Sequence, residues 1–247
     1  MLEVRGLTLR YPNGKQALTG VDLTVQPGEL VVVLGGNGSG KTTLLRCLTR
    51  TLAPTAGTVS VAGRDMTALA GEELRQARTS LALVSQHASL VKRRSVRANV
   101  ASGALGHYSS FMTSLGRLPR EELTLAHKYL DEVGLADLAG QRAGTLSGGQ
   151  AQRVAIARAL AQRPRAVLAD EPVASLDPEA AEEIMRLLKR LAKNDNLAVL
   201  CVLHQIDLAY GHADRVVGIR DGRVAFDLPK EDVARERVHD LYLSQAA

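Results

Sequence analysis

Residues 35–43 have the sequence GGNGSGKTT, and this stretch constrains the fold more strongly than any other part of the chain. The apolar run Leu30–Leu34 precedes it, and Leu44, Leu45 and Leu48 follow it at helical spacing. The stretch therefore matches the pattern G-x-x-x-x-G-K-[ST] between a strand and a helix, which is the context of a phosphate-binding loop. We expect an α/β protein with this loop at the end of a buried strand.

The residue types in the loop suit the binding of an anion. Glycines allow the backbone to wrap closely around phosphate oxygens with its N–H groups pointing inward. The helix that begins near Lys41 adds free N–H groups and the positive end of its dipole. We expect Lys41 to reach the outer phosphates, Thr42 to ligate a bridging Mg²⁺ and Thr43 to touch an inner phosphate. The candidate nucleotide contacts are Gly35, Gly36, Asn37, Gly38, Ser39, Gly40, Lys41, Thr42 and Thr43.

The composition indicates a protein with a full apolar core. The chain has 247 residues and no Trp, while Val, Leu, Ala and Gly are frequent, as in buried parallel strands covered by helices. The apolar runs Leu30–Leu34 and Leu197–Leu203 are too short to cross a bilayer, and residues 1–5 show no signal-peptide pattern. We therefore expect a cytosolic protein. Cys47 and Cys201 fall within apolar patterns, which favours buried free thiols.

The formal net charge of +5 raises the question of an anionic partner. The excess is concentrated in residues 61–120, which hold nine Lys or Arg residues against three Asp or Glu residues. Almost no aromatic residues lie among the basic ones, so nucleic acid is not an expected partner. Lys92, Arg93 and Arg94 form either a solvated basic face or a contact surface for a membrane partner.

Two candidate site residues follow predicted strands outside the loop. Residues 2–10 and 18–25 alternate as antiparallel strands, and Tyr11 stands at the end of the first. Tyr11 is either an ordinary exposed tyrosine or a flat ring that stacks on a purine. Leu81–Val84 is predicted to be a buried strand that leads to Gln86. Gln86 is either a surface residue or a group that holds the metal or the attacking water.

Residues 87–145 are interpreted as a mostly helical insertion, with apolar periodicity between Glu121 and Val133. The LSGGQ sequence at Leu146–Gln150 follows and opens a strongly periodic helix that runs to about Leu160. A serine and two glycines at a helix start form either a second anion site or an ordinary serine cap followed by a turn. The residues of this candidate site are Ser147, Gly148, Gly149 and Gln150.

Two acidic residues end the predicted apolar strand that begins at Ala166, and Pro172 prevents its continuation. Ligands are expected at the carboxyl ends of parallel strands. Asp170 is therefore a candidate outer-shell holder of Mg²⁺, and Glu171 is a candidate base that orients and deprotonates a water for attack on a γ-phosphate. The alternative is a pair of solvated acids.

Asp177 precedes Pro178, and the pair is predicted to start a helix. The apolar strand predicted at 197–203 ends at His204. A lone histidine is usually structural, but this one lies at the same rim as the acidic pair and is a candidate γ-phosphate sensor. Residues 215–227 are predicted to form a hairpin, and a short helix closes the chain.

Taken together, these motifs resemble the ATPase subunit of ABC transporters, and the match spans nearly the whole chain. The resemblance implies that two subunits dimerise head to tail around two ATP molecules, each held between the phosphate-binding loop of one chain and the LSGGQ signature of the other. It also implies a set of roles: Tyr11 on adenine, Lys41 on phosphates, Thr42 and Gln86 at Mg²⁺, Glu171 as general base, His204 on the γ-phosphate, Ser147 and Gly149 on the partner's ATP, and Asp177 among the nucleotide contacts.

Within this family the chain is most similar to the phosphonate-import ATPases, through Leu168–Pro178, Leu203–Ala209 and the insertion Asn99–Glu121. This similarity implies a motor subunit on the cytoplasmic side of the membrane, which energises transport of phosphonate or a related phosphorus oxyanion. A separate membrane permease and a solute-binding protein would be its partners. Ala151 and the basic Lys92–Arg94 depart from the family pattern. The alternative is a soluble ABC-type ATPase that serves a phosphonate-metabolism or assembly complex.

The predicted fold is therefore an α/β, P-loop ABC-type nucleotide-binding domain with an antiparallel β subdomain and an inserted helical subdomain. Residues 1–86 and 163–247 are expected to form the RecA-like core and the β subdomain. Residues 87–162 are expected to form the helical subdomain that carries the signature.

Overall fold

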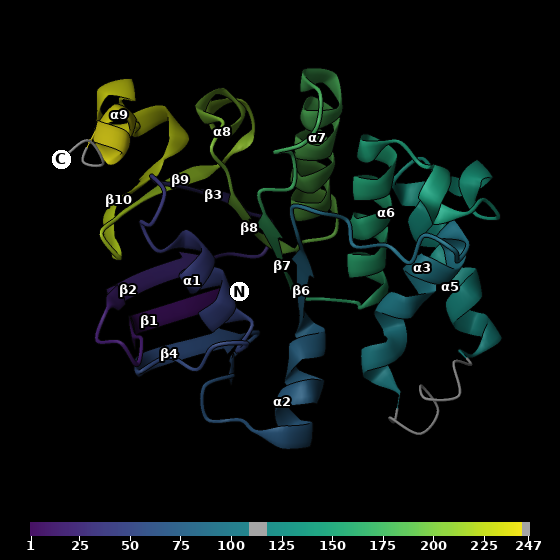
Figure 1. Ribbon diagram of the computed structural model, residues 1–247, viewed down its shortest axis with the longest axis horizontal. Coiled ribbons are helices and arrows are strands. Elements are labelled where there is room, and N and C mark those ends of the chain that lie inside the picture. The colour runs from purple at the N-terminus through teal and green to yellow at the C-terminus, as the bar shows by residue number, and fades with distance from the viewer. Residues whose placement is uncertain (109–117, 244–247) are drawn as a thin grey trace.

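The computed structural model describes residues 1–108 and 118–243 and arranges them as two sheets surrounded by helices (Figure 1). The strands are β1 (Leu2–Arg10), β2 (Gln16–Val25), β3 (Leu30–Leu34), β4 (Ala56–Val61), β5 (Arg64–Asp65), β6 (Leu81–Val84), β7 (Ala166–Asp170), β8 (Ala198–Val202), β9 (Arg215–Arg220) and β10 (Arg223–Pro229). The smaller sheet is antiparallel, in the order β2-β1-β4-β5. The larger sheet has the order β10-β9-β3-β8-β7-β6 and is parallel except for the β9–β10 hairpin.

The helices are α1 (Lys41–Leu48), α2 (Gly71–Ala77), α3 (Val96–Ala101), α5 (Arg120–Glu132), α6 (Gly148–Ala161), α7 (Pro178–Asn194), α8 (Ile206–His212) and α9 (Arg235–Leu243). Helix α1 packs on one face of the larger sheet, and α6 and α7 pack on the other. Asp177 caps α7, since its side chain accepts a hydrogen bond from the N–H of Ala180 at 2.9 Å. Pro178 occupies the first turn, so the predicted start of this helix is confirmed.

Strand β3 separates two apolar clusters because its side chains alternate between the two faces of the sheet. Val31 and Val33 pack with α1 and the antiparallel sheet. Leu30, Val32 and Leu34 pack with the cluster that includes α6 and α7. All five residues are fully buried, which explains why the sequence of this strand is a continuous apolar run. The phosphate-binding loop therefore follows a strand that is buried along its whole length.

Helices α3, α5 and α6 pack on one another beside α7, away from the antiparallel sheet (Figure 1). The helix predicted over 121–133 is confirmed as α5. The signature helix begins at Gly148, directly after the capping serine. Residues 109–117, which belong to the insertion used for the resemblance, lie outside the described residues.

Several simpler expectations are also confirmed. The strands predicted at 2–10, 18–25, 81–84 and 197–203 and the hairpin at 215–227 are present, with ends that differ by one or two residues. Cys47 and Cys201 are buried and unpaired, and burial raises the pKa of the Cys47 thiol to about 11. Within residues 1–108 and 118–243, no helix has both the length and the apolar character needed to span a membrane.

Candidate nucleotide-binding site

Close packing behind the phosphate-binding loop requires glycine at two positions. A Cβ on Gly35 would stand 2.3 Å from the carbonyl oxygen of Ile219. Gly40 has a φ of 111°, and a Cβ there would stand 2.8 Å from the carbonyl oxygen of Ala17. The loop thus passes between the antiparallel sheet and the end of β9 with no room for side chains at these points. This packing fixes the path of the backbone amides from Gly36 to Lys41.

The Lys41 ammonium lies folded beneath the loop. Its Nζ donates to the carbonyl oxygen of Gly35 at 2.6 Å and to that of Gly36 at 2.9 Å, and the side chain is buried. Burial lowers the pKa of Lys41, while the nearby carboxylates of Glu171 and Asp170 act in the opposite direction. The ammonium is therefore held at the inner side of the loop by backbone carbonyls and facing acids.

A cavity of about 250 Å³ opens above the loop and gathers most of the predicted nucleotide contacts. The Tyr11 hydroxyl lies 3.2 Å from Thr43 Oγ1, which places the ring at one edge of this cavity. Lys15 and Ala17, from the turn and strand that follow Tyr11, also line it and had no signal in the sequence pattern. The other lining residues are Asn37, Gly38, Ser39, Gly40, Lys41, Thr42, Glu171 and His204.

Glu171 and His204 meet at the carboxyl ends of β7 and β8. His204 Nε2 lies 2.7 Å from Glu171 Oε1, and the Glu171 N–H donates to the carbonyl oxygen of Val202 at 3.1 Å. Glu171 has a φ of 48°, a left-handed conformation that is uncommon for residues other than glycine. Such conformations persist where the surrounding structure enforces them, often at functional sites. The ends of β7 and β8 thus place the Glu171 carboxylate and the His204 imidazole in the same cavity as the loop residues.

Asp170 lies one residue earlier and is partly buried. Burial and the adjacent Glu171 carboxylate raise the pKa of Asp170, against the opposing effect of Arg46, Lys41 and His204. The two carboxylates therefore repel each other in an environment that favours the neutral acid. A cation placed beside them would relieve this repulsion.

Five groups of predicted residues are not among the residues that line the cavity: Gly35 with Gly36, Gln86, Asp170, the signature and Asp177. Gln86 is exposed in the segment after β6. In the signature, Ser147 and Gln150 form a reciprocal capping box: Ser147 Oγ accepts from Gln150 N at 3.3 Å, and Gln150 Oε1 accepts from Ser147 N at 3.0 Å. Within one chain, the signature serine therefore acts as a helix cap.

Two side chains of α6 fasten the segment that contains Gln86, although no pattern in the sequence indicated them. The buried Gln152 amide donates to the carbonyl oxygen of Ser85 at 3.0 Å. The Arg158 guanidinium donates to the carbonyl oxygens of Ala88 at 2.7 Å and Ser89 at 2.9 Å. The helix that carries the signature is thus tied directly to the segment that follows β6.

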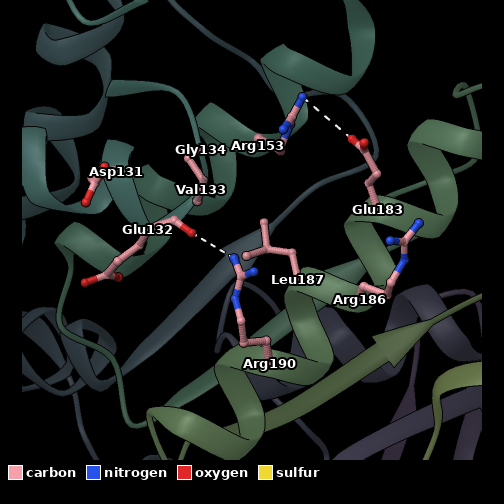
Figure 2. Close-up of a pocket in the computed structure, with 9 residues that line it drawn as sticks. All are labelled: Asp131, Glu132, Val133, Gly134, Arg153, Glu183, Arg186, Leu187 and Arg190. Carbon is pink, nitrogen blue, oxygen red and sulfur yellow. Dashed lines mark hydrogen bonds and ion pairs between the residues drawn. The ribbon is translucent and has the colours of Figure 1, made fainter. Parts of the chain in front are cut away.

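A larger cavity, of about 480 Å³, lies between α5, α6 and α7 and contains none of the predicted site residues (Figure 2). Its arginines contact neighbouring groups: Arg153 pairs with Glu183 at 3.7 Å, and Arg190 donates to the carbonyl oxygen of Glu132 at 2.8 Å. In Figure 2, the side chains of Asp131 and Glu132 point away from these arginines. Of these two cavities, the smaller one alone is lined by residues expected of a nucleotide site.

Comparison with known proteins identifies the class of protein to which this chain belongs. The family model described as ABC transporter matches residues 18–174, more than half of the chain, so the chain belongs to the ABC transporter family and is an ATP-binding cassette that hydrolyses ATP. "Phosphonates import ATP-binding protein PhnC 3" from Halalkalibacterium halodurans is 44% identical to it, covering 98% of this chain and 94% of the relative. "Phosphonates import ATP-binding protein PhnC" from Shouchella clausii is also 44% identical, covering 98% of this chain and 91% of the relative.

Solved structures confirm the predicted cassette fold. CbiO1 from Clostridium perfringens, part of the transporter complex cbiONQ, superposes with a TM-score of 0.84 at 29% identity, covering 99% of this chain and 95% of the other. The dimeric cassette MJ0796, bound to ADP and Pi in a post-hydrolysis state, superposes with a TM-score of 0.79 at 32% identity. That match covers 93% of this chain and 99% of MJ0796.

The raised pKa of Asp170 predicts that Asp170→Asn stabilises the protein when nucleotide is absent. Because the folded chain binds this proton more tightly than the unfolded chain, wild-type stability falls as pH rises from the ordinary value of 3.8 through the raised pKa. Asp170→Asn does not lose stability in this way. The difference in free energy of unfolding between the variant and the wild type should therefore grow as the pH rises from 3.8 to the raised pKa and then stay constant. Urea unfolding across pH 3.5 to 8 measures it, with the exposed Asp137→Asn as control. Equal pH profiles for wild type and Asp170→Asn would contradict this account.

Proposed function

We propose that this chain is the ATPase subunit of an ABC importer for phosphonate or a related phosphorus oxyanion, and that it works through a separate membrane permease. The observation that carries the proposal is the convergence of the phosphate-binding loop, Glu171 and His204 on one cavity. The substrate class rests on the relatives named as phosphonates import proteins, which align with 98% of the chain. The location proposed is the cytoplasmic side of the membrane.

The phosphate-binding loop is assigned to the triphosphate of ATP. The N–H groups of residues 36–41 bind phosphate oxygens, and Lys41 turns from the loop carbonyls toward the outer phosphates. Tyr11 stacks on adenine from the edge of the cavity, where its hydroxyl already contacts Thr43. The loop and Tyr11 thus bind the two ends of the nucleotide.

The residues around Asp170 fit a magnesium ion that arrives with the nucleotide. Across the described residues, no group of three His, Cys, Asp or Glu side chains is arranged to hold a metal by itself. This fits Mg²⁺, which takes few protein ligands and keeps waters and substrate phosphates in its shell. Thr42 and Gln86 would supply oxygen ligands, and Asp170 would hold the ion through its outer shell. When bound, Mg²⁺ neutralises charge on the β- and γ-phosphates.

Glu171 is assigned as the general base and His204 as the group that contacts the γ-phosphate. A water hydrogen-bonded to Glu171 gives its proton to the carboxylate while its oxygen bonds to the γ-phosphorus. The bond from the γ-phosphorus to the bridging oxygen breaks, which leaves ADP and phosphate. The Nε2 of His204, 2.7 Å from Glu171 Oε1, holds the carboxylate in place and lies within the same cavity as the phosphate-binding loop.

A second copy of the chain would complete the site. Ser147, Gly148, Gly149, Gln150 and Asp177 are absent from the cavity of their own chain, so a head-to-tail dimer is proposed to bring them to the partner's ATP. The dimeric form of the related cassette MJ0796 supports this arrangement.

The permease is proposed to bind the helical part of the chain. Residues 87–162 are assigned to a helical subdomain, and 1–86 with 163–247 to the core and β subdomain. In the segment after β6, Val91 is exposed beside the exposed basic residues Lys92, Arg93 and Arg94. A permease segment with apolar and acidic side chains matches this surface. An extracytoplasmic solute-binding protein would act only through the permease.

Glu171→Gln is expected to reduce ATP turnover at least a hundredfold and to abolish phosphonate uptake, because the amide cannot take the proton from water. Purified protein provides the turnover, and uptake of labelled methylphosphonate is followed in cells in which the variant replaces the wild-type chain. Ala151→Gln, which restores the more common residue after the signature, is the control and retains both activities. If the wild-type protein hydrolyses ATP but supports no uptake in cells that also express a phosphonate permease, the soluble assembly ATPase would be favoured instead.

Reversal of the basic surface tests the permease contact separately from hydrolysis. Replacement of Lys92, Arg93 and Arg94 by Glu is expected to leave turnover of the isolated protein within about twofold, because these exposed side chains lie outside the nucleotide cavity. Copurification with the permease should be lost. Arg64→Glu with Arg223→Glu, at exposed positions on the two sheets, is the control and should leave copurification intact. Unchanged copurification of the triple variant would refute the assignment of this surface.

A further inference from the structure

Helix α9 packs behind the phosphate-binding loop. Figure 1 shows it next to β9 and β10, and its residues Val238 and Leu241 are buried. A small cavity of about 190 Å³ lies between Leu241, residues 36–39, Arg220 at the end of β9 and Asp221 in the β9–β10 turn. Tyr11 and Leu241 thus line two different cavities, and Asn37, Gly38 and Ser39 of the loop line both.

Tyr242 reaches from α9 toward the first residue of the loop. Its hydroxyl is buried and has no hydrogen-bond partner that meets ordinary geometry. Burial raises the pKa of Tyr242, and the backbone amide of Gly35 is close enough to act in the opposite direction. A buried hydroxyl without a partner is destabilising and is uncommon in native structures. The Gly35 N–H is therefore a candidate donor to this hydroxyl.

The segment that leads into α9 is anchored to the helix that follows His204. The Tyr210 hydroxyl, on α8, donates to the carbonyl oxygen of Val233 at 2.9 Å. The Arg235 guanidinium lies 5.6 Å from the centre of the Tyr210 ring and pairs with Asp207 at 3.5 Å. Residues 233–242 thus run from α8, which begins two residues after His204, to the start of the phosphate-binding loop.

We propose that Tyr242 is a positioning residue for ATP binding: its hydroxyl accepts a hydrogen bond from the Gly35 N–H when the loop closes on phosphate, and so holds the loop from behind. The inference rests on the proposed assignment of residues 35–43 to the phosphates of ATP. The hydrogen bond is stronger in the bound state than in the free state, so it stabilises the nucleotide complex rather than the fold. Tyr242 itself does not touch ATP.

The test is Tyr242→Phe, which keeps the ring and removes only the hydroxyl. Loss of one net hydrogen bond should weaken ATP binding about fivefold and raise KM for ATP by a similar factor, with kcat within about twofold. The midpoint of thermal unfolding without nucleotide should not fall, because the lost hydroxyl has no partner in that state. Tyr129→Phe is the matched control. Tyr129 is a half-buried tyrosine of α5 that packs on the same apolar cluster as Tyr242. The Tyr129→Phe variant should bind ATP as tightly as the wild type does.

Two outcomes would overturn the proposal. If Tyr242→Phe binds ATP as tightly as the wild type does, the hydroxyl has no role in ATP binding. A lower unfolding midpoint with unchanged KM would make Tyr242 a structural residue only. Lys41→Ala, measured in parallel, separates these outcomes from failure of the site assignment: if Lys41→Ala also binds ATP as wild type does, the loop itself has been assigned wrongly.

Discussion

The site depends on the close packing of the phosphate-binding loop against the β9–β10 turn and the antiparallel sheet. The N–H of Gly222, in the β9–β10 turn, donates to the carbonyl oxygen of Ser39 at 2.9 Å, and the N–H of Thr19, in β2, donates to the carbonyl oxygen of Gly222 at 2.8 Å. A Cβ on Gly222 would stand 2.5 Å from the carbonyl oxygen of Ala17. The loop, the hairpin turn and the antiparallel sheet therefore form one backbone-to-backbone contact. Because this contact leaves no room for side chains, it sets the direction of the loop amides before any ligand arrives.

The charges around the loop are arranged for function at a cost to stability. Burial disfavours both the Lys41 ammonium and the Asp170 carboxylate, so each has a pKa displaced toward its neutral form. Displaced pKa values of opposite charges beside one cavity are typical of a functional site. The contacts of Gln152 and Arg158 extend this site toward the helical part of the chain, because they fasten the segment after β6 to the helix that begins with the signature. A shift of that helix would therefore move Gln86 as well.

Much of the fold and the centre of the site could be predicted because their signals are local. The buried strands β3 and β8 are continuous apolar runs, Lys41 belongs to the G-x-x-x-x-G-K-[ST] pattern, and Glu171 directly follows a predicted strand. Helix α2 was not predicted, since its sequence GEELRQA is mostly polar and only Ala77 is buried. Lys15 and Tyr242 were missed because tertiary packing alone brings them to the loop. The metal and signature contacts stay predictions, since they involve groups beyond one chain.

Each chain is proposed to hold half of a nucleotide site, so ATP should bring two chains together. The most direct measurement is the mass in solution of Glu171→Gln by light scattering, with and without MgATP, because this variant should bind ATP without hydrolysing it. Glu171→Gln should be a monomer without nucleotide and a dimer with ATP, and Ser147→Arg in the same background should prevent the dimer. A Glu171→Gln protein that binds ATP yet keeps the mass of a monomer at high protein concentration would contradict the claim that the signature of a second chain completes the site.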